Sequence, residues 1–198
     1  MTDLVLASGS RIRAELLRNA GLTFRIDPAQ VDERAVEAPL LESGFSPEDI
    51  AQVLGEAKAQ ETSARNPGAL VVGADQVLEF GGARLTKPDD MEAARRQLLA
   101  MSGKIHALHS AAAIARDGET IWRTVRTVRM KMRAFGPEFV GRYLAVVGDD
   151  ALASVGAYQL EGRGVQLFDA IDGDYFTVLG LPLLPLLEEL RRQGVLET

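Results

Sequence analysis

The chain has 198 residues and a formal net charge of −6 at pH 7, because 28 Asp and Glu outnumber 22 Lys and Arg. With 46% hydrophobic and 25% charged residues, it has the composition of a globular protein that can bury a core. Cysteine is absent, which excludes a cysteine nucleophile, a thiolate metal site and a disulfide framework, and fits a cytoplasmic location. No apolar stretch reaches the roughly 20 residues of a membrane span. A net negative charge argues against nucleic acid as a partner, so we expect neither a membrane nor a nucleic-acid partner.

The N-terminal region predicts a strand, a tight loop and a helix. Residues 4–7 form a short apolar run, the loop 8–10 follows, and apolar residues then recur at helical spacing over 12–20. A second strand is expected over 24–26.

A long helix is expected over 47–65, because Ser46 can cap its start and a proline follows directly. The continuous apolar run 70–74 is typical of a strand that is covered on both faces, and we expect that strand to end at Asp75.

The rest of the chain continues as alternating helices and strands. In chain order we expect a turn at 81–82, a helix over 89–101, two strands over 104–115 and 119–133 joined by a turn at 117–118, a helix over 137–147, a strand over 165–171 and a helix over 182–193. This order predicts an α/β fold around a mixed sheet with flanking helices.

The loop from Ser8 to Ser10 is a candidate anion site. Backbone N–H groups at the start of a helix attract negative charge, and Gly9 permits a close approach. Arg11 and Arg13 follow at once. The alternative is an ordinary helix cap by Ser10 with two solvated arginines, which the segment alone favours. The loop lacks the Gly-Lys-Ser/Thr ending of a P-loop.

Two charged residues stand where apolar residues are expected. Lys58 follows Ile50 and Leu54 at steps of four, on the face of the helix that should point inward. It is either a functional cation or a lysine whose long side chain reaches past the apolar edge to solvent. Asp75 ends a buried strand, where α/β sheets present groups to ligands. A turn-forming role is less favoured for Asp75, because the next residues carry no turn chemistry. An acid in this position can bind a metal ion or activate water.

Three further charged residues are weaker candidates. Glu33 follows a predicted strand in a loop, where acids are usually solvated, and Lys87 stands before a proline, where an exposed loop lysine is the plainer interpretation. Glu161 lies among glycines that would let backbone pack close to a ligand, or that simply form a turn. We assign structural roles to His106 and His109, because residues three apart on a strand point to opposite faces.

The chain resembles the Maf family of nucleoside triphosphate pyrophosphatases, also called septum-formation-inhibitor-like proteins, over nearly its whole length. The resemblance rests on the order and spacing of short motifs: LASGSRIRAELL at 6–17, VDE at 31–33, EAKA at 56–59, VVGADQV at 71–77, TKP at 86–88, SG at 102–103 followed by His106, GAYQLEGRG at 156–164 and GDYFTVLGLPL at 173–183. It implies one domain over 1–198 with a Maf/ITPase-like α/β fold, in which two lobes surround a deep cleft. It also implies a homodimer and metal-dependent hydrolysis of a nucleoside triphosphate to the monophosphate and pyrophosphate, with house-cleaning of non-standard nucleotides and cell-division arrest as biological roles.

Carried over position by position, the resemblance implies a set of site residues. The catalytic and metal-binding residues would be Asp75 and Glu33, with Mg²⁺ or Mn²⁺ as the ion because the ligands are oxygens. The substrate-binding residues would be Ser8, Arg13, Lys58, Lys87, Gln76 and Glu161.

The chain departs from the usual family pattern at four places. Arg11 and Ile12 stand where Pro and Arg are usual, Gln76 replaces Thr, Glu161 replaces Gln, and Thr86 stands where Gly is common before Lys87. Gln76 and Glu161 resemble the branch that prefers 7-methyl-GTP over the branch that prefers dTTP and UTP. A carboxylate at Glu161 can accept hydrogen bonds from the Watson–Crick edge of guanine; the alternative is a third acid beside the metal.

Two other functions compete with this hypothesis. A non-catalytic regulator of cell division would bind a nucleotide without turnover, and an interaction protein would dock a partner on its acidic surface. Removal of pyrophosphate from inosine or xanthosine triphosphate shares the general architecture, but not these motifs.

Overall fold

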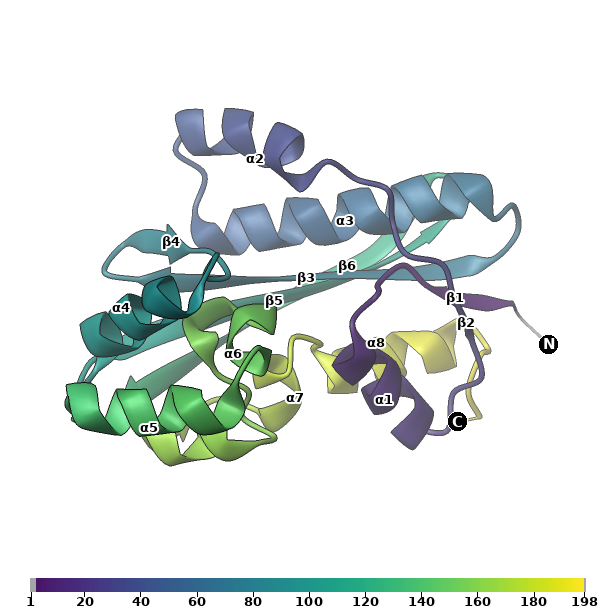
Figure 1. The fold of residues 1–198 in the computed structure, drawn as a ribbon. Helices are drawn as coiled ribbons and strands as arrows, with labels where there is room; N and C mark the ends of the chain where they lie inside the picture. Colours follow the sequence, from purple (N-terminus) through teal and green to yellow (C-terminus); the bar gives the residue numbers. More distant parts are fainter. Residues whose placement is uncertain (1–2, 198) are drawn as a thin grey trace. The chain divides into compact units, whose positions relative to one another are not determined.

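The computed structural model describes residues 3–197 and shows a mixed α/β fold around a seven-stranded sheet (Figure 1). The strands are β1 (Leu4–Leu6), β2 (Arg25–Ile26), β3 (Leu70–Phe80), β4 (Ala83–Leu85), β5 (Ile105–Arg116), β6 (Glu119–Met132) and β7 (Phe168–Asp172). Their order in the sheet is β2-β1-β3-β5-β6-β7, and β4 pairs with β3. β1 runs parallel to both β2 and β3, whereas the β3–β4 and β6–β7 pairs are antiparallel. The sheet is therefore mixed, as the sequence predicts.

Helices separate most of the strands along the chain. They are α1 (Arg11–Asn19), α2 (Glu33–Glu42), α3 (Pro47–Arg65), α4 (Met91–Met101), α5 (Pro137–Val147), α6 (Asp150–Ala153), α7 (Tyr175–Val178) and α8 (Leu183–Arg192), with 3-10 turns at Val155–Ala157 and Arg163–Leu167. No helix in the described part of the chain is both long and apolar enough to cross a membrane.

The described residues form two compact units. The first contains residues 3–76, 109–126 and 180–197, and the second contains residues 77–108 and 127–179. Large apolar side chains are fully buried in each unit, such as Leu6, Leu17 and Leu54 in the first and Leu98 and Met130 in the second.

In the first unit, α3 lies along the sheet (Figure 1) and approaches β3 closely. A Cβ atom at Gly73 would lie 2.4 Å from the carbonyl oxygen of Gly55 and 2.5 Å from the backbone nitrogen of Ala59. A Cβ atom cannot approach backbone atoms so closely. The backbones of α3 and β3 can therefore pack at this distance only because Gly73 has no side chain. The same turn of α3 carries Lys58, and β3 continues from Gly73 to Asp75.

In the second unit, a buried aromatic group surrounds a histidine. His106 Nε2 lies 2.7 Å from the hydroxyl oxygen of Tyr158, and both rings also contact Phe168. His106 is buried, and its Nδ1 has no hydrogen-bond partner in the described part of the chain. Burial lowers the pKa of His106 to about 4, so the imidazole is neutral at neutral pH.

Several predicted elements have the observed bounds, and three predictions are wrong. The helices over 47–65 and 137–147 match α3 and α5. β3 does not end at Asp75 but continues to Phe80, because β4 pairs with its last residues. Glu33 is not in a loop: it begins α2, whose cap is the Asp32 side chain.

The third wrong prediction is a strand over 165–171. Residues up to Leu167 form a 3-10 turn, and the strand β7 follows it. The turn is possible because Gly164 has no side chain: a Cβ there would lie 2.4 Å from the carbonyl oxygen of Gln159.

Candidate active site

The centre of the candidate site is a lysine between two carboxylates in the first unit. Lys58 Nζ lies 2.6 Å from Asp75 Oδ1 and 2.7 Å from Glu33 Oε1. The side chains of Lys58 and Asp75 are only 12% and 9% exposed, whereas that of Glu33 is 48% exposed. The prediction that Lys58 faces inward is confirmed, and its ammonium group is held by two acids that come from α2 and β3.

The cluster combines acids with cations. Lys58 lies between the carboxylates of Asp75 and Glu33, and the charge of Arg13 interacts with the same two carboxylates. Carboxylate oxygens are also the ligands that a hard divalent cation prefers.

A divalent metal ion fits the cluster in part. Mg²⁺ prefers oxygen ligands and is commonly held by one or two carboxylates together with phosphate oxygens and water. Asp75 and Glu33 supply two such carboxylates, and no group of three or more His, Asp or Glu residues in the described part of the chain could hold a metal ion by itself. The residues therefore fit an ion that arrives with a phosphate ligand better than an ion held by protein alone.

Arg13 approaches the same region from α1. Its Nε donates to the carbonyl oxygen of Gly180 at 2.8 Å, and its Nη1 donates to the carbonyl oxygen of Ala74 at 2.9 Å and to Ser8 Oγ at 3.3 Å. Burial lowers the pKa of Arg13, while the charges of Asp75 and Glu33 act in the opposite direction. Its reference pKa is so high that the guanidinium keeps its charge at neutral pH.

The loop after β1 contains the helix cap that one of its two interpretations predicts, and the anion site stays a prediction. Ser10 caps α1 by accepting from the backbone nitrogen of Arg13, as an ordinary cap does. Arg11 is exposed, with a long contact of 3.7 Å to Glu15. Arg13, in contrast, is turned inward toward Ser8, so only one of the two arginines is solvated.

Gln76 is the next residue of β3 after Asp75. Its side-chain amide donates from Nε2 to Ser110 Oγ at 2.9 Å, and Ser110 is fully buried on β5. The structure thus brings together six predicted residues in the first unit: Ser8, Arg13, Glu33, Lys58, Asp75 and Gln76.

Lys87 and Glu161 belong to the second unit. Lys87 is exposed in the segment between β4 and α4. Glu161 is exposed in the turn after the buried Leu160, which agrees with the glycine-rich turn that the sequence allows. Their roles toward a substrate stay predictions.

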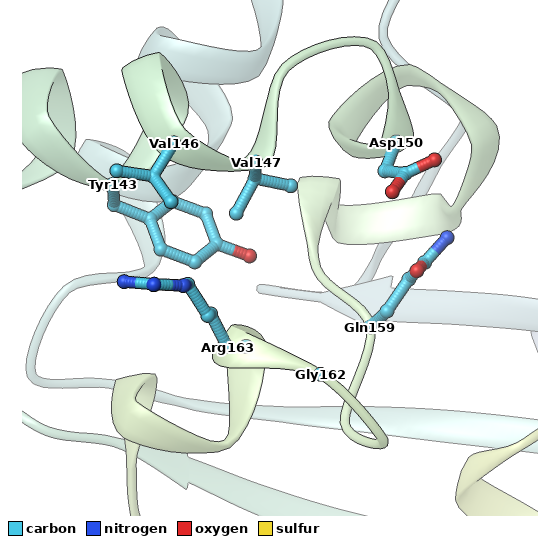
Figure 2. A pocket seen from close by; sticks show the side chains of 8 residues that line it. Tyr143, Val146, Val147, Asp150, Gln159, Gly162 and Arg163 are labelled. Carbon is cyan, nitrogen blue, oxygen red and sulfur yellow. The ribbon is translucent and has the colours of Figure 1, made fainter.

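The second unit also contains a pocket of about 220 Å³ beside the C-terminal end of α5 (Figure 2). Its lining consists of Tyr143, Val146, Val147, Asp150, Gln159, Gly162, Arg163 and Gly164. Figure 2 shows the Arg163 guanidinium beside the ring of Tyr143. Burial raises the pKa of Tyr143 to about 12, so its phenol stays protonated. The lining offers one carboxylate, Asp150, and one cation, Arg163, and it includes none of the predicted site residues.

Sequence reasoning missed the groups that hold Arg13 and Gln76. Two are backbone carbonyls, at Ala74 and Gly180, and the third is the buried hydroxyl of Ser110. One signal was available, because Gly180 lies in the motif at 173–183 that the resemblance left without a role.

The family of the chain follows from its sequence over nearly its whole length. Residues 3–193 match the sequence profile of the family described as Maf-like protein, so the chain belongs to that family. The family match covers these residues in one stretch, and the single domain over 1–198 stays a prediction.

Its relatives are named as pyrophosphatases. The chain is 60% identical to the 7-methyl-GTP pyrophosphatase of Brucella suis over 194 residues, and this alignment covers 98% of both chains. It is also 60% identical to the 7-methyl-GTP pyrophosphatase of Mesorhizobium japonicum over 198 residues, and that alignment covers 100% of both chains. The nucleoside triphosphate pyrophosphatase of Ruegeria pomeroyi is 49% identical over 195 residues, with 98% of each chain covered.

Proposed function

We propose that this protein hydrolyses a nucleoside triphosphate to the nucleoside monophosphate and pyrophosphate. The observation that carries the proposal is the cluster in which Lys58 lies within 2.7 Å of both Asp75 and Glu33, with the inward-facing Arg13 from α1. In this cluster, acids that can orient a water molecule lie beside cations that can hold a polyphosphate. The names of relatives up to 60% identical support the same reaction.

The reaction needs a water molecule, an electrophilic phosphorus and a stabilised leaving group. The oxygen of water forms a bond to the α-phosphorus, the bond from that phosphorus to the bridging oxygen of the β-phosphate breaks, and pyrophosphate leaves. Asp75 orients the water, as general base or as metal ligand. Arg13 and Lys58 bind the oxygens of the triphosphate, where charge-assisted hydrogen bonds are strongest.

We further propose that a divalent ion, Mg²⁺ or Mn²⁺, takes part. Asp75 and Glu33 would hold it together with phosphate oxygens, and it would supply positive charge to offset that of the triphosphate. Ser8 and Lys87 would add further contacts to the phosphates, from the loop after β1 and from the segment before α4.

The substrate we propose is a guanine nucleotide methylated at N7. Two relatives carry that substrate in their names. Glu161 would accept from the donors on the Watson–Crick edge of guanine, and its negative charge suits a methylated, cationic base. Gln76 would contribute to the same choice of base. A cytoplasmic location and a homodimer accompany this proposal as expectations, to be checked by cell fractionation and by sedimentation.

The direct test measures pyrophosphate release from a panel of nucleotides with Mg²⁺. The panel contains 7-methyl-GTP, GTP, dTTP, UTP, ITP and XTP. We expect turnover with 7-methyl-GTP fastest; faster turnover of dTTP and UTP would overturn the assigned base, and binding without release would favour the non-catalytic regulator.

Asp75→Asn tests the assigned residue in the same assay. It removes the charge and nearly preserves the shape, so release should fall by about 10²- to 10⁴-fold, with the fold kept by circular dichroism. Glu188→Gln, at an exposed acid of α8, is the matched control and should keep full activity. Unchanged turnover by the Asp75 variant would remove this residue from the reaction.

A further inference from the structure

The motif at residues 173–183 contains a glycine that the proposed reaction does not yet use. Gly180 lies between α7 and α8, and its backbone has φ +88°, the left-handed region that favours glycine. Its carbonyl oxygen accepts the 2.8 Å hydrogen bond from Arg13 Nε. A turn glycine 167 residues away in the chain therefore contacts the arginine of the candidate site directly.

Three acceptors fix the orientation of the Arg13 guanidinium. Nε is held by Gly180, while Nη1 is held by Ala74 and by Ser8. Two of the three acceptors are backbone carbonyls, which cannot rotate away as a side chain can. The hydrogen bonds found for this guanidinium among residues 3–197 come from Nε and Nη1, so Nη2 is the amino group that we assign to a ligand.

The space beside that amino group depends on the missing side chain of Gly180. A Cβ atom there would lie 3.3 Å from Nη2 and 3.5 Å from Nε of Arg13, and 3.6 Å from Cδ of Gln76. It would crowd this amino group first, and the positive φ would strain the backbone as well. Gly180 thus accepts a hydrogen bond from Arg13, and a side chain at this position would reach both Arg13 and Gln76, to which we assign substrate binding.

We propose that Gly180 is a positioning residue that aims the Arg13 guanidinium at the triphosphate, through its carbonyl oxygen and through the absence of a Cβ atom. This inference rests on the proposed function for the identity of the ligand. Gly180 itself does not touch the substrate in this scheme; it acts through Arg13.

The test compares Gly180→Ala with a glycine that has the same backbone strain and no neighbour. Gly21, after α1, has φ +81°, and a Cβ there would meet nothing within 4 Å. Tripolyphosphate serves as the probe, because it carries the phosphate chain without a base. Its dissociation constant is measured by calorimetry, alongside kcat and KM for pyrophosphate release.

We expect Gly180→Ala to raise the tripolyphosphate dissociation constant and KM by about tenfold, the effect of losing one well-placed charge-assisted hydrogen bond. Gly21→Ala should stay within about twofold of the wild type, although both variants lose similar stability to backbone strain. Equal dissociation constants for the two alanine variants would overturn the proposal.

A double-variant cycle shows whether the effect passes through Arg13. Lysine cannot reproduce the fork of hydrogen bonds that arginine makes, so in the Arg13→Lys background the further change Gly180→Ala should alter tripolyphosphate binding less than twofold. Full additivity would mean that Gly180 acts elsewhere and would overturn the proposal.

Two complications have separate remedies. If Gly180→Ala fails to fold, Gly180→Asn and Gly21→Asn replace the alanine pair, because asparagine tolerates positive φ and still adds a Cβ atom. If the wild type binds tripolyphosphate but hydrolyses no nucleotide, the proposed function fails while the comparison of the two glycines still decides the role of Gly180.

Discussion

We assign two roles to Lys58, one in substrate binding and one in stability. As a binding residue it offers charge to a phosphate; as a structural residue it offsets the charge of Asp75, whose side chain is 9% exposed. Removing one partner of a buried ion pair leaves an uncompensated charge and costs about 3 to 5 kcal/mol. We therefore expect Lys58→Met to lower the free energy of unfolding by about 3 kcal/mol, as measured by urea denaturation.

The double variant Lys58→Met, Asp75→Asn supplies the control. With both charges gone, no buried carboxylate lacks a partner, so the double variant should be more stable than Lys58→Met alone. Additive losses in this cycle would show that the two groups do not interact in the folded state.

The residues of the site differ in how far the sequence predicts them. The inward position of Lys58 could be predicted, because residues four apart share one face of a helix. The bonds that hold Arg13 could not, because every residue carries a carbonyl group and only the folded chain shows that those of Ala74 and Gly180 face it. Asp75 was predicted as a site residue for its place at a strand end, yet it lies within β3.

At the scale of elements, the packing of α3 on β3 sets the distance between Lys58 and Asp75. A Cβ at Gly73 would overlap backbone atoms of Gly55 and Ala59, and backbone atoms cannot move aside without shifting α3. We expect Gly73→Ala to lower the free energy of unfolding by about 3 kcal/mol, measured by thermal and urea denaturation.

Gly141, inside α5, is the matched control for this prediction. A Cβ there meets only the flexible end of Arg95, at 3.5 Å, and alanine favours a helix over glycine by about 1 kcal/mol. Gly141→Ala should keep or raise the stability. A Gly73→Ala protein as stable as the wild type would show that α3 can move away from β3 at no cost.

An element could be predicted well from the sequence when clear residue signals mark where it begins and ends. α3 could be predicted to the residue, because a capping serine with a proline begins it and Asn66-Pro67-Gly68 follows it. α2 was missed because it contains Pro39 and buries little: Glu37 is its buried residue. Its weak apolar pattern resembles a solvated loop, and the Asp32 cap and the packing against α3 support it as a helix.

At the scale of the whole molecule, one buried histidine should control stability in mild acid. Burial lowers the pKa of His106 to about 4 in the folded protein, while an unfolded chain restores about 6.5. Between these two values the unfolded state binds the proton and the folded state does not, so stability falls as the pH falls from about 6.5 to 4. Above pH 6.5 the neutral His106 makes its full contribution to the free energy of unfolding. At pH 4 about 3 kcal/mol of that contribution has been lost.

His106→Gln tests this prediction, because glutamine does not titrate there. The free energy of unfolding is measured for both proteins by urea denaturation between pH 7 and pH 4. The stability advantage of the wild type over the variant should shrink by about 3 kcal/mol across this range. Tyr158→Phe is the control: it removes the hydroxyl at 2.7 Å from His106 but keeps the ring that buries it, so its pH dependence should follow that of the wild type. A wild-type advantage that stays constant with pH would mean that His106 takes up its proton as readily in the folded protein as in the unfolded chain.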